Sequence, residues 1–201
     1  MIAVIDYGVG NLFSLTASLN SLGLENVVTG DPAMIAAADR IILPGVGAFG
    51  DAMDKLRDKG LENVLISEAE KGKPFLGICL GMQMLHEESS EYGRHKGLGL
   101  IPGRVEPLKE CTSGLKVPAM GWNALKAVKE CPILKYFPDG GYVYYVHSYF
   151  VPRGASTAAY SEYGAEVSGV TWNGLNVFGT QFHPEKSGND GLKILRAFGE
   201  L

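Results

Sequence analysis

The stretch PFLGICLGMQMLHEE, Pro74 to Glu88, decides the fold, because an apolar strand runs directly into a helix with Cys79 at the junction. Gly77 and Gly81 stand two residues on either side of the cysteine, and G-x-C-x-G is the cysteine form of a nucleophile elbow. Such a turn strains the backbone and brings segments close, which residues without a Cβ tolerate. Unpaired N–H groups at the helix N-terminus favour a thiolate. The stretch alone leaves two interpretations open, a reactive thiol and a small buried apolar side chain.

Composition limits the class of protein. The chain has 201 residues, enough to bury its own core, so we expect a single domain over residues 1–201. The net charge of −4 comes from interspersed acidic and basic residues, which predicts small molecules or proteins as partners and neither nucleic acid nor a membrane. Three widely separated cysteines without a C-x-x-C pair suit a reducing compartment. The chain opens as a strand without a charged leader, so we expect a cytoplasmic protein. We also expect no metal and no cofactor.

The first half alternates apolar strands with amphipathic helices. Leucines at helical spacing predict a helix between an N-cap at Asn11 and Gly23. Strands separated by helices of this length form parallel sheets covered on both faces, which is the arrangement we expect. The expected strands are 3–6, 27–28, 41–43 and the strand that ends at Cys79; further helices follow Asp31 and the loop 44–50, with Gly60 and Gly72 as stops.

The second half has shorter strands separated by turn signals, which predicts antiparallel pairing. Residues 142–150, YVYYVHSYF, form a dense aromatic and β-branched run that favours one strand. Asn173 and Gly174 between two apolar runs predict a hairpin with a type I′ turn. The second strand of this hairpin, 177–182, leads to HPEKS, and an amphipathic helix containing Leu192 and Phe198 follows.

His183 and Glu185 are the candidates to assist a thiolate. A thiolate nucleophile needs a base, and the base needs an orienting acceptor. Pro184 between them has a fixed φ and so stiffens their spacing. The end of a strand in an open α/β sheet is also where binding crevices form. The other histidines compete for the role and are structural alternatives: His86, His95 and His147.

The loop PGVGAFG allows three interpretations. Gly45, Gly47 and Gly50 spell the dinucleotide fingerprint G-x-G-x-x-G, but the loop follows the third strand, and Pro44 forces an extended entry. A glycine-rich segment beside an elbow can instead direct N–H groups at an oxyanion, together with the N–H of Leu80. The glycines could also simply permit a turn.

Together these motifs resemble the class I, triad-type glutamine amidotransferases. The resemblance rests on GICLGMQ around Cys79, PGVG at Pro44–Gly47 and HPEKS at His183–Ser187. Within the family the chain is most similar to the glutaminase subunits of imidazole glycerol phosphate synthase, through DYGVGN at 6–11, PGVGAFGDAM at 44–53, VPAMGWN at 117–123 and YYVHSY at 144–149. Ala119 departs from the pattern, because relatives usually carry histidine there, near the expected synthase interface.

The resemblance implies a flavodoxin-like three-layer α/β/α fold, with a mostly parallel sheet and smaller antiparallel strands in the second half. It also implies a Cys79–His183–Glu185 triad that hydrolyses glutamine, with the N–H groups of Val46 and Leu80 holding the oxyanion. Implied substrate-binding residues are Gly47, Gln83, Glu91, Ser148 and Tyr149. Without the resemblance, Gln83 could equally be an ordinary helix residue, and Glu91 could equally be a solvated charge in a loop.

The implied partner is a separate barrel-shaped cyclase or synthase subunit of histidine biosynthesis, bound as a heterodimer. The resemblance places Asn11, Met120, Trp122, Asn123 and Tyr144 at the interface and ammonia path, although Trp122 and Tyr144 could equally be core aromatics. Two alternatives stay open. One is a glutaminase subunit for another synthase, such as anthranilate synthase, and the other is a non-catalytic flavodoxin-like binding module.

Overall fold

A computed structural model describes residues 1–201 and shows an eight-stranded sheet in the order β2-β1-β3-β4-β14-β13-β12-β9. The strands from β2 to β14 in this order run parallel, and β13, β12 and β9 continue the sheet antiparallel. The first half comprises β1 Ile2–Ile5, α1 Leu12–Ser21, β2 Asn26–Thr29, α2 Pro32–Ala37, β3 Arg40–Gly45, α3 Phe49–Asp58, α4 Leu61–Glu70, β4 Phe75–Cys79 and α5 Leu80–Leu85.

The second half adds two smaller sheets, β10-β8 and β11-β7-β5-β6. Its elements are β5 Glu88–Ser89, β6 His95–Lys96, β7 Arg104–Pro107, α6 Leu108–Cys111, β8 Ala119–Ala124, β9 Lys126–Ala127, the 3₁₀ turn η1 Pro132–Leu134, β10 Tyr142–His147, β11 Tyr149–Phe150, β12 Thr157–Glu162, β13 Glu166–Trp172, β14 Val177–Thr180, the 3₁₀ turn η2 Pro184–Lys186 and α7 Gly188–Gly199.

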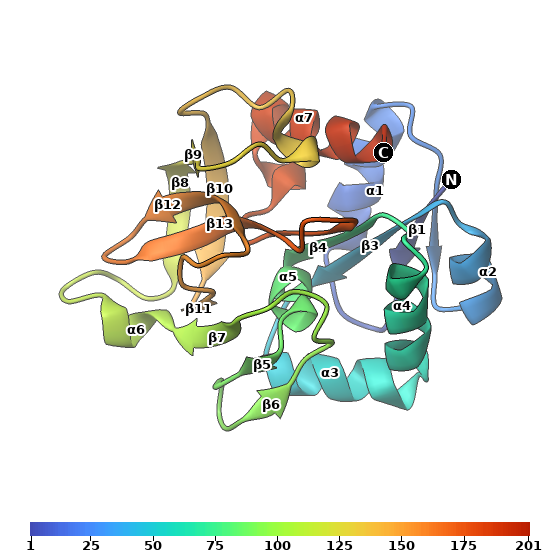
Figure 1. The fold of residues 1–201 in the computed structure, drawn as a ribbon, viewed down its shortest axis with the longest axis horizontal. Helices are drawn as coiled ribbons and strands as arrows, with labels where there is room; N and C mark the ends of the chain where they lie inside the picture. The colour runs from blue at the N-terminus through green and yellow to red at the C-terminus, as the bar shows by residue number, and fades with distance from the viewer.

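Helices cover both faces of the large sheet (Figure 1). One core lies beneath α2 to α5 and contains Ile35, Leu56 and Leu65, whereas the other lies beneath α1 and α7 and contains Leu19 and Phe198. Side chains alternate between the two faces of a strand, so that Phe75 and Leu76 of β4 enter different cores. The prediction of a three-layer fold with a mostly parallel sheet is confirmed.

The predicted helix starts are confirmed by their caps. The Asn11 side chain accepts a hydrogen bond from the Ser14 N–H at the start of α1, and Asp31 does the same for Ala33 at the start of α2. These bonds satisfy N–H groups that the first turn of a helix leaves without partners. The strand predicted at 41–43 extends further, because β3 continues to Gly45 alongside Cys79 of β4.

Two predictions for the second half are wrong in detail. Residues 142–150 form two strands, because β10 pairs with β8 whereas β11 pairs with β7 in another sheet. Ser148 separates them, and its carbonyl accepts from the Leu108 N–H. The predicted hairpin of β13 and β14 exists, but its turn is not type I′, since Asn173 lacks the positive φ that this turn requires. The Asn173 Oδ1 instead accepts from the N–H groups of Leu175 and Val177.

No helix in the structure combines the length and the apolar character needed to cross a membrane.

Candidate active site

Cys79 forms a strained junction between β4 and α5. Its φ of 57° and ψ of −112° lie outside the helical and extended regions, a conformation that persists only where the surroundings enforce it. A Cβ on Gly81 would lie 1.8 Å from the Leu43 carbonyl oxygen, and a Cβ on Gly77 would lie 2.6 Å from the Gly81 oxygen. The two glycines therefore let α5 approach β3 and β4 closely enough to form the elbow.

Gly45 is a third point of close approach. A Cβ at this position would lie 2.8 Å from the Gly81 nitrogen and 2.9 Å from the Tyr7 hydroxyl. The end of β3 is thus pressed against the start of α5. This contact places the loop after Gly45 beside Cys79.

His183 and Glu185 form a buried pair. The His183 Nδ1 lies 2.8 Å from the Glu185 Oε1, and both side chains are almost fully buried. Burial lowers the pKa of His183, but the hydrogen bonds and charges of Cys79 and Glu185 outweigh burial and raise it to about 9. The ring is therefore held in its protonated form between Cys79 and Glu185.

The turn that carries His183 is fastened to β10. The His183 N–H donates to the Tyr144 carbonyl at 3.0 Å. The Ser187 hydroxyl donates to the His183 carbonyl at 2.6 Å and accepts from the Tyr144 N–H at 2.9 Å. One residue of β10 thus holds both ends of the His183 to Ser187 turn through its main chain.

Cys79 and His183 line one cavity of about 310 Å³. This volume falls at the lower end of the range typical of small-molecule sites. Every predicted oxyanion and substrate-binding residue lines it: Val46, Gly47, Leu80, Gln83, Glu91, Ser148 and Tyr149. Glu185 does not line the cavity and lies behind His183. The structure does not bring three His, Cys, Asp or Glu side chains together where they could hold a metal ion.

Glu91 closes the N-terminus of α3. Its carboxylate accepts from the Phe49 N–H at 2.6 Å, and burial, partly offset by this bond, raises its pKa. A phosphate at the glycine-rich loop would use the same helix end. The buried carboxylate there contradicts the dinucleotide interpretation of Gly45, Gly47 and Gly50.

The competing histidines have structural surroundings. His86 contacts the Pro102 carbonyl and the Thr171 hydroxyl, and burial lowers its pKa to about 4. Burial also lowers the pKa of His147 to about 4, and its Nδ1 lies 3.0 Å from the Tyr149 carbonyl oxygen. His95 packs against Gly50, where a Cβ would lie 2.7 Å from its ring. Of the four histidines, only His183 has a carboxylate partner in this structure.

Comparison with known proteins agrees with this geometry. The family model "Glutamine amidotransferase class-I" matches residues 3–200. The chain belongs to this family. It is 47% identical over 207 residues to the imidazole glycerol phosphate synthase subunit HisH of Syntrophotalea carbinolica, with 100% of both chains covered. It is 50% identical over 202 residues to the subunit of the same name from Desulfitobacterium hafniense, with 100% of this chain and 94% of the relative covered. A solved structure described as a glutamine amidotransferase shares the fold with a TM-score of 0.77 at 20% identity, over 100% of this chain and 98% of the other.

Sequence reasoning missed four residues of the amidotransferase cavity and its wall. Pro118, Val146 and His147 line the cavity, and the Cys79 Sγ donates to the Val146 carbonyl at 3.8 Å. Gln181 is fully buried, with its Nε2 4.0 Å from the Cys79 Sγ. Strand alternation offered a signal for Gln181, because it stands two residues before His183 and so faces the same side. The other three lie where residues 117–118 and the end of β10 fold back over the elbow, which no local pattern predicts.

The predicted interface residues of the amidotransferase lie around the cavity rather than in it. Trp122 pairs with Tyr144 across β8 and β10, with ring centroids 6.0 Å apart, and Met120 and Trp122 are 65% and 56% exposed. The Asn123 amide donates to the Glu162 carbonyl. Asn11 caps α1 and lines a small void beside His183 and Glu185. Trp122 is therefore no core aromatic.

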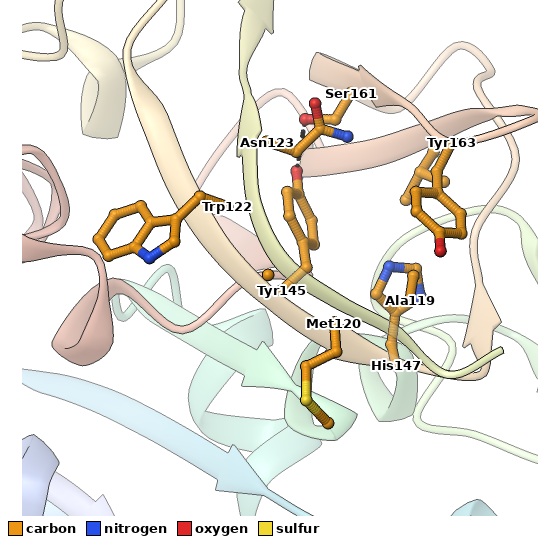
Figure 2. Close-up of a pocket in the computed structure, with 10 residues that line it drawn as sticks. Ala119, Met120, Trp122, Asn123, Tyr145, His147, Ser161 and Tyr163 are labelled. Carbon is orange, nitrogen blue, oxygen red and sulfur yellow. Dashed lines mark hydrogen bonds between the residues drawn. The ribbon is translucent and has the colours of Figure 1, made fainter. Parts of the chain in front are cut away.

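A second, smaller cavity of about 50 Å³ shares His147 with the cavity that contains Cys79 (Figure 2). Met120, Trp122 and Asn123 line it, together with Ala119, Tyr145, His147 and Tyr163. Ala119 is only 3% exposed and packs against Leu108 and Phe150. The alanine itself is therefore buried, next to the exposed Met120 of the same strand.

Proposed function

We propose that this amidotransferase is the glutaminase subunit of imidazole glycerol phosphate synthase. It hydrolyses glutamine to glutamate and ammonia and passes the ammonia to a separate barrel-shaped synthase subunit. The observation that carries this proposal is that Cys79 of the elbow shares one cavity with His183, whose ring is paired with the buried Glu185. The names of relatives at 47% and 50% identity over the whole chain support the choice of synthase.

The triad supplies the chemistry. The Cys79 thiolate attacks the carboxamide carbon of glutamine, and the protonated His183 gives its proton to the departing ammonia. A thioester remains on Cys79. His183 then takes a proton from water, which attacks the thioester and releases glutamate. Glu185 orients the ring and stabilises its charge, a role supported by the 2.8 Å contact with Nδ1.

The backbone supplies the oxyanion site. Val46 follows the tight contact at Gly45, and Leu80 is the first residue of α5, so their N–H groups are proposed to face the carboxamide oxygen as it becomes negative. Such donors act most strongly when they are already in place before the reaction.

The polar end of glutamine is proposed to lie against Gln83 and Glu91, with the backbone of Gly47, Ser148 and Tyr149 along its sides. Glu91 has an acceptor lone pair beyond its bond with Phe49 and suits the ammonium group of the substrate. This arrangement places the carboxamide deepest in the cavity, beside the sulfur.

The synthase is proposed to dock over Asn11, Met120, Trp122, Asn123 and Tyr144, forming a cytoplasmic heterodimer. Exposed Met and Trp side chains are typical of docking surfaces, and the main chain of Tyr144 holds the His183 turn. We further propose that residues 1–201 act as one domain, which the family match over residues 3–200 supports. The three free cysteines suit a reducing compartment.

Assays with candidate synthases test the proposal. The protein is mixed with a synthase of the histidine pathway or with an anthranilate synthase, and glutamate release is measured with the acceptor nucleotide present. Stimulation by the histidine-pathway synthase alone is expected, and stimulation only by the other would overturn the choice of synthase. A glutamine-derived chloroketone should label Cys79; labelling elsewhere, or none, would favour a binding module.

A further inference from the structure

We propose that Gln181 donates a hydrogen bond to the sulfur of Cys79, and that the Tyr149 carbonyl fixes the direction of this bond through Gln83. The inference deepens the proposed function, because it adds a residue that touches the reacting atom. It concerns one chain of contacts through three elements, from β11 through α5 to the end of β14.

The chain of contacts is continuous and buried. The Gln83 Nε2 donates to the Tyr149 carbonyl at 2.9 Å and to the Gln181 Oε1 at 3.1 Å. The Gln181 Nε2 lies 4.0 Å from the Cys79 Sγ. Gln181 is 0% exposed and Gln83 is 5% exposed, so water does not compete for these groups.

The orientation of the Gln83 and Gln181 amides follows from which groups can donate and which can accept a hydrogen bond. A main-chain carbonyl can only accept, so the nitrogen of Gln83 must face Tyr149. The second hydrogen of that nitrogen then points at Gln181, which must turn its oxygen towards it. The nitrogen of Gln181 is thereby left facing the sulfur. A flipped Gln181 would put two nitrogens together and an oxygen against the nucleophile.

Two titratable groups face the Cys79 sulfur, the His183 ring and the Tyr7 hydroxyl, and both keep their places in every variant tested below. Besides them, the sulfur has one acceptor and one donor within reach, the Val146 carbonyl and the Gln181 amide. The thiol donates to the Val146 carbonyl at 3.8 Å, a contact that favours the neutral form. Once the proton leaves, that carbonyl repels the sulfur, whereas the N–H of Gln181 is attracted to it. Gln181 therefore stabilises the thiolate selectively, whereas the Val146 carbonyl stabilises the thiol.

Substrate binding can strengthen the hydrogen bond to the Cys79 sulfur through the same chain of contacts. The Gln83 Oε1 makes no hydrogen bond within the protein, and Gln83 lines the cavity. A glutamine group that donates to this oxygen would polarise the Gln83 amide and, through it, the amide of Gln181. Binding and activation of the nucleophile are thereby coupled.

The test is the pH dependence of Cys79 alkylation by iodoacetamide, in the full chain and without glutamine or synthase. Mass spectrometry of the Cys79 peptide separates it from the exposed Cys111, which serves as an internal reference. Gln181→Met removes the donor, and Gln181→Asn keeps a buried amide too short to join Gln83 to the sulfur. Both are expected to move the midpoint upward by about one pH unit, a tenfold lower rate below the midpoint.

The matched control is Thr180→Val, which changes the neighbouring buried residue, whose hydroxyl has no hydrogen-bond partner. It should leave the midpoint in place. Circular dichroism establishes which variants fold, and if Gln181→Met does not, Gln181→Asn decides. An unchanged midpoint in a folded Gln181 variant, or an equal shift in Thr180→Val, would overturn the proposal. Because the readout uses neither substrate nor partner, it stands apart from the glutaminase assay.

Discussion

At the scale of single residues, the candidate site depends on three positions where only a glycine fits. Gly45, Gly77 and Gly81 each sit where a Cβ would lie less than 3.0 Å from a backbone atom of a neighbouring segment. Their absence of side chains lets β3, β4 and α5 meet at Cys79, whose own φ of 57° carries the strain of the turn. Cys79, the proposed nucleophile, thus lines the cavity although the residue as a whole is buried.

Cys79→Ala should fold normally and release no ammonia. Alanine keeps the Cβ and therefore the same backbone strain, and the loss of one sulfur from a buried site costs about 1 kcal/mol of unfolding free energy. Thermal unfolding and an ammonia assay with the synthase present check the two halves of this prediction. Appreciable ammonia release by the variant would show that another residue is the nucleophile.

Glu185→Gln should impair hydrolysis less than His183→Ala. The imidazole moves protons in both steps, so its loss should reduce the rate by about 10² to 10⁴, whereas the carboxylate only orients and stabilises it. Glutamine is nearly isosteric, and the Glu185 Oε2 has no hydrogen-bond partner to lose. Steady-state kinetics under matched conditions give the order, and the reverse order would reassign the base.

The pH dependence of stability should report the His183 ion pair. The pKa of His183 is raised from 6.5 to about 9 in the folded protein, so its stabilising effect is complete below pH 6.5 and is lost as the pH rises through 9. The difference in unfolding free energy between wild type and His183→Gln should therefore fall by on the order of 3 kcal/mol over this range.

Urea denaturation at pH 6, 7.5, 9 and 10 measures this difference. The cavity left by the substitution contributes equally at every pH and cancels from the trend. In a Cys79→Ala background the fall should be smaller, because the hydrogen bond and charge interaction with the Cys79 sulfur, which raise the pKa of His183, are gone. A difference that stays constant with pH would contradict a protonated His183.

At the scale of elements, the site lies where the carboxyl ends of β3, β4 and β14 meet the second-half strands β10 and β11. β10 contributes Tyr144, which fastens the His183 turn, and the loop after β5 contributes Glu91, which caps α3 from 42 residues away. Neither contact belongs to the parallel core. The two smaller sheets therefore supply contacts of the candidate site that the parallel strands do not.

Ser187→Ala tests the fastening of the His183 turn. The hydroxyl bridges the His183 carbonyl and the Tyr144 N–H, so its loss leaves a buried donor without a partner and should cost about 1–3 kcal/mol. A freed turn should also lower the turnover number more than it changes the affinity for glutamine. Urea denaturation and kinetics measure both effects. Unaltered turnover in a destabilised protein would show that the bridge is structural only.

At the scale of the whole molecule, the sequence predicted those elements that short stretches of sequence determine. Helical spacing and the caps Asn11 and Asp31 located helices, and the glycines around Cys79 located the elbow. The division of residues 142–150 was missed because β propensity is the same for both pieces and only their distant partners differ. The burial of Ala119 could not be predicted for a similar reason, since it depends on contacts with Leu108 and Phe150.

The loop from Gly45 to Phe49 is the part of the molecule best suited to a switch. Gly47 has a φ of 96° with no heavy atom within 4 Å of the Cβ position, and Val46 is exposed. The peptide between Gly45 and Val46 lies at the cavity wall. Its rotation would turn the Val46 N–H towards or away from the oxyanion without moving Cys79, His183 or Glu185.

The isolated chain should accordingly hydrolyse glutamine weakly, and the synthase with its nucleotide bound should stimulate it strongly. The loss of one oriented donor lowers a rate by roughly 10² to 10³, enough to keep the enzyme nearly inactive with an intact triad. Glutaminase assays of the subunit alone and of the complex measure the stimulation, and crystal structures of both with a glutamine analogue give the direction of the Val46 N–H. Full activity of the subunit alone would refute partner control. Stimulation with that N–H already facing the oxyanion site at rest would refute the peptide rotation and leave partner control standing.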